Sequence, residues 1–280
     1  MPNINNPSAK FTYTEIHMGG ELRLTFYASD QSQADQAAKA AYVEIERLEQ
    51  IMSDYRPSSE IRQLKPNVKT KISDPLFEII TIAQKISAET DGAFDITAGP
   101  AVKLWRNARA TGRLPGPIEV KQALKFVDYR QITLDPTDQT ITVSKPGFAI
   151  DLGGIAKGYA CDAAIRILKE NQISQAIVQA GGDIAISNPP PNQEGWQVQI
   201  PGEPSPRAFQ NCAISTSGDT EQFIEFNGNR YSHIVDPRTG IGVTNRVMAT
   251  VIAKRGAFSD PLATAHCVQG IGGITDTRNP

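Results

Sequence analysis

The chain is poor in the residues that build metal cages and disulfide frameworks. Its 280 residues include three cysteines and three histidines. The cysteines, Cys161, Cys212 and Cys267, are far apart and show no C-x-x-C spacing. Their separation argues against a disulfide framework and against a thiolate zinc site. The histidines are equally scattered along the chain, so a histidine-rich metal site is not expected.

The sequence also lacks an excess of charge and any long apolar run. Basic and acidic residues number 28 and 30, a net charge of -2, so a general nucleic-acid-binding surface is not expected. No stretch of about 18 apolar residues is present, which predicts no transmembrane segment. The first residues lack the basic and apolar regions of a signal peptide. The sequence therefore predicts a cytoplasmic protein, or a periplasmic or membrane-anchored one if a signal has been removed.

Apolar periodicity predicts several separated helices. Ala38, Ala41, Ile45 and Leu48 recur at helical spacing, which indicates a long amphipathic helix over 31–52. Another helix is expected over 73–90, with Asp74 as its cap. Three further helices are expected: a short one that ends at Trp105, one over 156–170 and one over 259–268. A polar connection over 106–118 is expected to follow the short helix.

Short apolar or alternating runs predict strands. They cover 21–28, 132–134, 140–143, 149–152, 174–179, 196–200, 212–216 and 247–253, and a hairpin joins 223–226 to 231–235. Short strands mixed with separated helices favour an α+β fold over a doubly wound sheet. No linker divides the chain, so we expect one compact unit over 16–270 between an N-terminal tail at 1–15 and a C-terminal tail at 271–280.

A glycine-rich turn follows the strand expected at 149–152. Asp151 enters this turn, and Gly153 and Gly154 allow a ligand to approach the backbone closely. Free amides at a helix start attract phosphate, and Lys157 would add a positive charge. The turn is neither a Walker A loop nor G-x-G-x-x-G. Taken alone, an ordinary strand-to-helix turn with a capping Asp explains it equally well.

Three further segments place polar residues among apolar ones. The AGGD and TSGD segments, at 180–183 and 216–219, each end in a carboxylate, and tight turns would also explain them. His233 precedes DPRTG at a strand end, where it could act as an acid or base near neutral pH, although most single histidines are not catalytic. Asp260 and Thr264 share a helix face and form a partial shell for Mg²⁺, but a capping Asp with a packed Thr is the alternative.

Taken together, these segments resemble the FAD:protein FMN transferases, or ApbE-type flavin transferases. Eight motifs follow the family order along nearly the whole chain. They are MGG at 18–20, SDYRPSSE at 53–60, DGAFDIT at 91–97, DLGGIAKGYACD at 151–162, AGGDI at 180–184, TSGD at 216–219, YSHIVDPRTG at 231–240 and SDPLAT at 259–264. Each motif is weak alone, but eight in register favour a functional interpretation of the segments above.

The resemblance implies an α+β, two-lobed catalytic unit that binds FAD with Mg²⁺ and transfers FMN to a Thr or Ser hydroxyl of an acceptor flavoprotein. AMP is released. It implies metal ligation by Asp260, Thr264 and the main-chain carbonyl of Gly154, and a role in catalysis for His233 and Asp260. His233 would remove the acceptor proton or orient the phosphate, and Asp236 is an alternative base. The flavin contacts implied by the family motifs are Met18, Tyr55, Ala93, Phe94, Asp95, Asp151, Lys157 and Ile234.

The sequence departs from the family pattern in a few places. Gly20 stands where the family usually has Thr, and Pro261 where it usually has Ala; a proline is tolerated at a helix start. After Gly270 the chain ends sooner than the family usually does, which would expose a sheet edge or weaken the metal-bearing helix. No D-x-x-[ST]-G-A-T acceptor segment is present, so the chain resembles the modifying enzyme and not its target.

Three other functions stay open at the level of sequence. An FAD pyrophosphatase would use the same site with water as acceptor, giving FMN and AMP. A catalytically silent FAD-binding protein would keep bound FAD intact. A flavin redox enzyme is less favoured, because the sequence has no nicotinamide-binding fingerprint.

Overall fold

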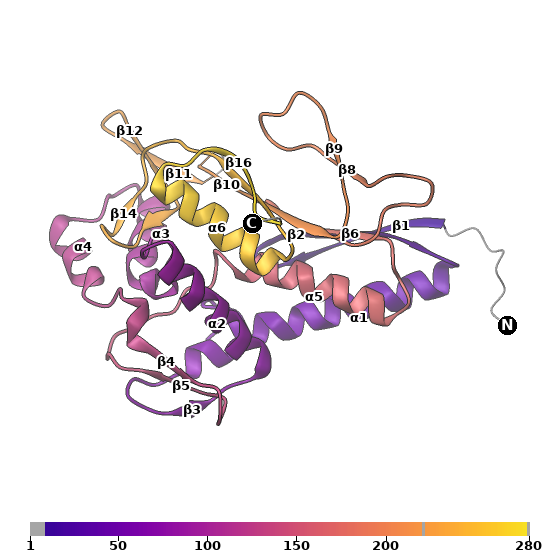
Figure 1. Ribbon diagram of the computed structural model, residues 1–280. Coiled ribbons are helices and arrows are strands. Elements are labelled where there is room, and N and C mark those ends of the chain that lie inside the picture. Colours follow the sequence, from indigo (N-terminus) through magenta and orange to yellow (C-terminus); the bar gives the residue numbers. More distant parts are fainter. Residues whose placement is uncertain (1–8, 220–221, 279–280) are drawn as a thin grey trace.

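The computed structural model describes residues 9–219 and 222–278. Its central feature is a seven-stranded sheet in the order β1-β2-β6-β7-β10-β15-β16 (Figure 1). Neighbouring strands pair antiparallel, except that β15 and β16 run parallel. The strands are β1 (Ala9–His17), β2 (Gly20–Ala28), β6 (Ala176–Ala180), β7 (Asp183–Ile186), β10 (Cys212–Ser217), β15 (Ala249–Ala253) and β16 (Gly273–Asp276).

Helices cover one face of this sheet, and a hairpin covers the other (Figure 1). The helices are α1 (Gln31–Met52), α5 (Ala156–Glu170) and α6 (Gly256–Gln269); the hairpin strands are β8 (Trp196–Val198) and β9 (Arg207–Phe209). Leu22, Leu24 and Phe26 of β2 pack against alanines of α1 and α5. On the opposite face, Trp196 and Phe209 pack against the sheet. The middle of the sheet is therefore buried on both sides.

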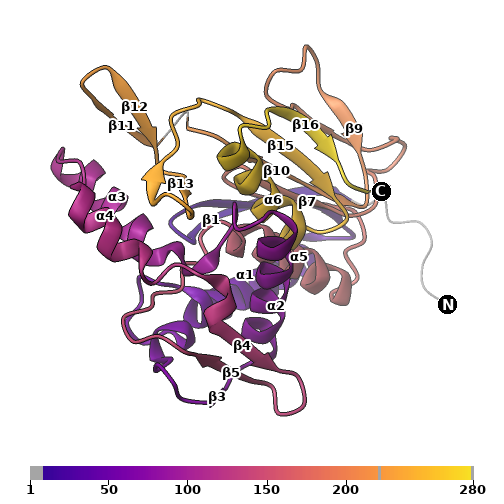
Figure 2. The ribbon, with the colours of Figure 1, turned by 60° about the vertical axis from the view of Figure 1, so that its left-hand side comes forward.

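A second group of elements lies beside the ends of these helices (Figure 2). Its helices are α2 (Asp74–Glu89), α3 (Gly99–Thr111) and α4 (Pro117–Leu124), together with the short 3-10 helices η1 (Glu60–Gln63), η2 (Ile96–Ala98) and η3 (Tyr129–Gln131). One small sheet has the order β3 (Thr70–Lys71), β5 (Thr140–Val143), β4 (Ile132–Asp135). Two hairpins complete the group: β11 (Phe223–Phe226) pairs with β12 (Asn229–Ser232), and β13 (Val235–Asp236) pairs with β14 (Ile241–Gly242). Leu76 and Ile79 of α2 share one core with Ile141 of β5 and Ala265 of α6. The two groups are therefore joined by continuous packing.

The two groups of elements form two lobes, and together they confirm the expected α+β fold. Several of the expected helix and strand boundaries were wrong. The helix expected to end at Trp105 continues to Thr111, where Gly112 ends it with a φ of +71°, and α4 fills part of the connection expected at 106–118. Residues 149–152 form no strand; the Asp151 N–H donates to the Ile96 carbonyl of η2 at 2.8 Å. At α2, Ser73 and not the expected Asp74 is the N-cap residue.

The expected tails were also partly wrong. Residues 9–15 belong to β1, which pairs with β2 along its whole length, and residues 273–276 form β16. The remaining residues of the expected N-terminal tail, 1–8, and residues 279–280 lie outside the described residues. Strand β1 is hard to find in the sequence because it is an edge strand, and most of its side chains are exposed. The alternation of apolar and polar residues that marks a half-buried strand is therefore weak in β1.

Helix α6 begins at Gly256, before the position expected from sequence. The reason is a cap from another helix: the Asp162 carboxylate accepts hydrogen bonds from the amides of Gly256 at 2.7 Å and Ala257 at 3.0 Å. Burial raises the pKa of Asp162 to about 6. Asp260 and Pro261 therefore lie inside the helix, and the interpretation of Asp260 as an N-cap is wrong. None of the helices in the described ranges is both long and apolar enough to cross a membrane.

Helices α5 and α6 cross where two glycines meet. A Cβ atom added to Gly158 would lie 2.2 Å from the carbonyl oxygen of Gly256, and one added to Gly256 would lie 2.3 Å from that of Gly158. No side chain fits at either position, so the backbones touch directly. The contact sets the start of α5 against the first turns of α6.

We expect Gly158→Ala to destabilise the protein by roughly 2–3 kcal/mol, because the added methyl group must push the helices apart. The measurement is the urea midpoint followed by circular dichroism. Gly20→Ala is the control: no atom lies within 4 Å of its added Cβ and its φ is not positive. Its free energy of unfolding should stay within about 0.5 kcal/mol of the unaltered protein. Equal effects of the two substitutions would contradict the tight crossing.

Candidate active site

Three ionisable side chains gather at this helix crossing. The Lys157 ammonium of α5 lies 2.8 Å from Oδ2 of Asp183, at the start of β7. Asp260 of α6 is 3% exposed, and its Oδ2 accepts a hydrogen bond from the Gly158 amide at 3.1 Å. Within the described parts of the chain, Oδ1 of Asp260 accepts no hydrogen bond. One oxygen of a buried carboxylate is therefore left for a ligand.

The two carboxylates share one cation. Burial, with the nearby charge of Asp183, raises the pKa of Asp260 to about 7. The charge of Asp183 also holds the pKa of Lys157 above its ordinary value, so the ammonium stays charged. With both carboxylates ionised, the trio carries a net charge of -1. A buried negative charge is costly without a counter-ion, so the arrangement favours uptake of a cation.

The glycine turn at 153–154 faces Thr264 of α6. A Cβ atom on Gly154 would lie 3.3 Å from Oγ1 of Thr264 and 3.2 Å from the ring of Phe94. The Thr264 hydroxyl lies 3.4 Å from that of Ser217. Carboxylate, hydroxyl and carbonyl oxygens are the ligands that Mg²⁺ prefers. The residues Asp260, Thr264 and Gly154 thus fit the metal that the family resemblance implies.

Arg106 of α3, to which the sequence analysis assigns no role, joins Tyr55 to Asp151. Its guanidinium donates to Oδ2 of Asp54 at 2.9 Å and to Oδ2 of Asp151 at 3.3 Å, and lies 4.3 Å from the centre of the Tyr55 ring. The other oxygen of Asp151 accepts the Gly153 amide at 2.8 Å. Tyr55 is 70% exposed, so much of its ring is free to stack on a flat ligand.

The ring of His233 is held by a main-chain carbonyl. Its Nδ1 lies 3.1 Å from the carbonyl oxygen of Gln222. Because a carbonyl can only accept, Nδ1 carries the proton, and Nε2 of the neutral ring keeps a free lone pair. Burial lowers the pKa of His233, and the positive charges of Arg109 and Lys157 lower it further, against the hydrogen bond to Gln222. The ring is therefore neutral at pH 7 and can accept a proton.

Ala93, Phe94 and Ile234 are buried in the core that joins the two lobes. The Ile234 amide donates to the Ser232 hydroxyl at 3.0 Å, and its carbonyl accepts the Val243 amide at 2.9 Å. Both backbone groups of Ile234 are thus used within the protein. They fix the segment that carries the neighbouring His233, and a direct flavin contact by Ile234 stays a prediction.

The Asp95 carboxylate is also used within the protein. It accepts the amide and the hydroxyl of Thr97, both at 2.7 Å, and the amide of Tyr129 at 2.9 Å. Burial raises its pKa, and these hydrogen bonds oppose that rise. Asp95 therefore shapes the loop that presents Phe94, and its direct contact with a flavin stays a prediction.

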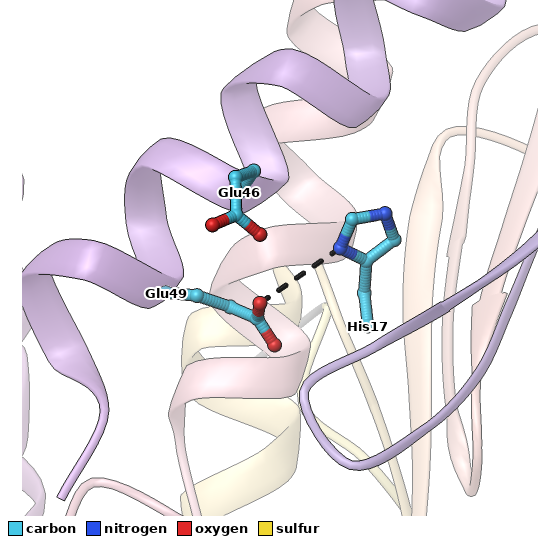
Figure 3. A group of neighbouring side chains, drawn as sticks. All are labelled: His17, Glu46 and Glu49. Carbon is cyan, nitrogen blue, oxygen red and sulfur yellow. Dashed lines mark ion pairs between the residues drawn. The ribbon is translucent and has the colours of Figure 1, made fainter. Parts of the chain in front are cut away.

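Met18 is held by Glu49 of α1, which lies beside Glu46 of the same helix and His17 of β1 (Figure 3). Its amide donates to Oε1 of Glu49, and its φ of +51° belongs to the tight turn between β1 and β2. His17 points toward Glu49, with Nδ1 and Oε2 3.9 Å apart. Arg56, next to Tyr55, donates to Oε2 of Glu49 at 2.6 Å. Glu49 therefore ties Met18 and Tyr55, two expected flavin contacts, to one helix.

The same cluster has the donor atoms of a metal site. One ligand atom each from His17, Glu46 and Glu49 lie within 4.8 Å of one another. The Arg56 guanidinium, however, pairs with Glu46 at 2.5 Å and with Glu49 at 2.6 Å, and its hydrogen bond lowers the pKa of Glu46 to about 2. Donors of Arg56 already occupy oxygens of both carboxylates, and the Met18 amide occupies another oxygen of Glu49, so we assign the cluster a positioning role.

The fold and site define an α+β protein in which two buried carboxylates, Asp183 and Asp260, lie beside Lys157 and near a glycine turn. The sequence model of the ApbE family matches residues 18–277. The chain belongs to the ApbE family.

Curated relatives and solved structures agree with this membership. The FAD:protein FMN transferase of Vibrio cholerae is 31% identical over 279 residues, covering 91% of this chain and 82% of its own. That of Salmonella typhimurium is 30% identical over 274 residues, covering 90% and 77%. The crystal structure of the ApbE protein of Thermotoga maritima superposes with a TM-score of 0.84 at 29% identity, covering 94% of this chain and 88% of its own.

We expect Glu49→Ala to lower the free energy of unfolding by about 1–3 kcal/mol, because it leaves the partly buried Met18 amide without its acceptor and removes one of the two carboxylates paired with Arg56. Glu46→Ala is the matched control on the same helix. The Glu46 side chain is 46% exposed, against 11% for Glu49, and its loss should cost less than about 1 kcal/mol. The measurement is the free energy of unfolding of both variants from chemical denaturation. A larger loss of stability for Glu46→Ala than for Glu49→Ala would contradict the assigned role of Glu49.

Proposed function

We propose that the protein transfers FMN from FAD to a Thr or Ser hydroxyl of an acceptor flavoprotein, with Mg²⁺ bound and with release of AMP. The relatives named FAD:protein FMN transferase support flavin transfer as its activity. The observation that carries the proposal is the free oxygen of the buried Asp260 carboxylate beside Thr264 and the Gly154 turn. An oxygen site of this kind suits Mg²⁺, which assists transfer of phosphorus-containing groups.

Mg²⁺ held by Asp260, Thr264 and the Gly154 carbonyl would supply charge neutralisation at the pyrophosphate. The chain's own groups supplement it. The ammonium of Lys157 would stabilise negative charge that develops on the phosphate oxygens. The exposed ring of Tyr55 offers a flat surface for the flavin or the adenine.

The proposed transfer exchanges one bond to phosphorus for another. The acceptor hydroxyl oxygen bonds to the phosphorus on the flavin side, and the bond from that phosphorus to the bridging oxygen breaks. The bridging oxygen leaves with AMP, and the hydroxyl proton moves to Nε2 of His233. The products are a phosphodiester between FMN and the acceptor, and AMP. Because the step needs little covalent chemistry from the protein, positioning and charge dominate.

We expect Asp260→Asn to lower the rate of AMP release by roughly 100-fold or more, since it removes the charge that holds the metal. The measurement is chromatography of FAD incubated with the protein and Mg²⁺, with and without an acceptor domain. Asp138→Asn, on an exposed turn, is the control with unchanged rate. AMP with free FMN in the absence of acceptor would instead support hydrolysis, and intact FAD in every reaction would contradict the proposal.

The pH dependence of transfer tests His233 separately. Burial lowers the pKa of His233 below the ordinary value of 6.5, so the proton-accepting form of the ring should still dominate at pH 6.5. When the pH falls below the lowered pKa, the ring becomes protonated, and kcat/KM should fall. We expect His233→Ala to be slower and to lack this acidic limb, whereas His266→Gln should keep it. A limb that His233→Ala leaves unchanged would remove His233 from the proton transfer.

A further inference from the structure

Arg109 lies on the face of α3 that borders the candidate site. It follows Arg106 by three residues and Trp105 by four, so all three side chains project from the same side of the helix. The Trp105 ring packs 5.1 Å from the ring of Tyr231, which precedes His233 in the chain. Trp105 thereby fixes this side of α3 against the segment that carries His233.

Arg109 differs from most arginines that the structure describes. Within residues 9–219 and 222–278, the arginines whose side chain makes no hydrogen bond or ion pair are Arg62, Arg109 and Arg246. Arg62 and Arg246 are exposed, so water solvates them, whereas Arg109 is half-buried. A guanidinium has five N–H donors, and removing them partly from water without an acceptor costs free energy. A ligand that supplies the acceptors would remove this cost.

The neighbouring cations differ from Arg109. Arg106 is paired with Asp54 and Asp151, and Lys157 is paired with Asp183. The positive charge of Arg109 is one cause that lowers the pKa of His233, after burial, and it opposes the rise of the Tyr55 pKa that burial produces. Arg109 is therefore within electrostatic reach of two candidate site residues that come from distant parts of the chain.

We propose that Arg109 is an anion-binding residue of the candidate site and that it binds a phosphate group of the flavin nucleotide. This inference rests on the proposed function, because that function brings FAD to the site. Guanidinium presents a planar fork of donors that fits two phosphate oxygens at once. Each other cation beside the site already has a protein carboxylate, so Arg109 is the group whose charge the ligand would balance.

The test compares three flavins that differ in phosphate with AMP, which carries only the adenosine-side phosphate. Riboflavin, FMN, FAD and AMP are titrated separately into the unaltered protein and Arg109→Met, without added metal so that FAD stays intact. We expect Arg109→Met to bind FAD and at least one of FMN and AMP about 10-fold or more weakly, while riboflavin affinity is unchanged. Weakening of FMN would assign Arg109 to the flavin-side phosphate, and weakening of AMP to the adenosine-side phosphate.

Two controls separate binding from folding. Lys103→Met removes an exposed charge from the same helix and should leave every affinity unchanged. Arg109→Lys keeps the charge but loses the fork, so its affinity for FAD should fall between the unaltered protein and Arg109→Met. Thermal unfolding of each variant shows whether it is folded at the temperature of titration.

Two results would overturn the inference. Unchanged FAD affinity in Arg109→Met would show that the guanidinium does not bind the nucleotide, even if the variant transfers FMN poorly to the acceptor. An equal loss of riboflavin and FMN affinity would show a structural role. If the unaltered protein bound none of the four ligands, the proposed function itself would fail, which is a distinct outcome.

Discussion

The direct backbone contact between Gly158 and Gly256 is the constraint on which the candidate site depends. Because neither residue has a side chain, α5 and α6 approach until carbonyl oxygens occupy the space of a Cβ atom. At that separation the Gly158 amide reaches the Asp260 carboxylate, and the Asp162 carboxylate reaches the start of α6. Side chains from two helices thus form one buried site whose geometry is set by backbone packing, which deforms less readily than a loop.

The centre and the edge of the site differ in burial and in hydrogen bonding. At the centre, the carboxylates of Asp183 and Asp260 are buried beside one lysine, and Oδ1 of Asp260 accepts no hydrogen bond from the described residues. At the edge, Glu49 holds Met18 and Arg56, and Arg106 holds Asp54 and Asp151, and these groups are only partly buried. The edge carboxylates accept hydrogen bonds from arginines and orient their neighbours, whereas the centre is suited to bind a ligand.

Much of the fold could be predicted from the sequence where a local residue pattern was enough to specify a helix or a turn. The periodic alanines of α1 and the strong pattern of α5 gave those helices their expected bounds, 31–52 and 156–170. The glycine turn was recognisable from Gly153 and Gly154. Prediction failed where the cause was distant along the chain: β1 depends on its pairing with β2, and α6 begins at a residue capped by α5. Arg106 and Glu49 carried no signal, because their partners lie in other segments.

The sequence by itself determined the chemistry of the site and its family pattern, since carboxylates, a lysine, a histidine and glycine turns occur in a fixed order along the chain. Tertiary structure alone decided which of these groups meet. It placed Asp183 against Lys157 and, among the residues that the structure describes, left one oxygen of Asp260 free and the half-buried Arg109 side chain without a partner. The physical reason is that burial and charge balance are properties of the packed lobes, and no local pattern of residues encodes the distance between groups on different elements.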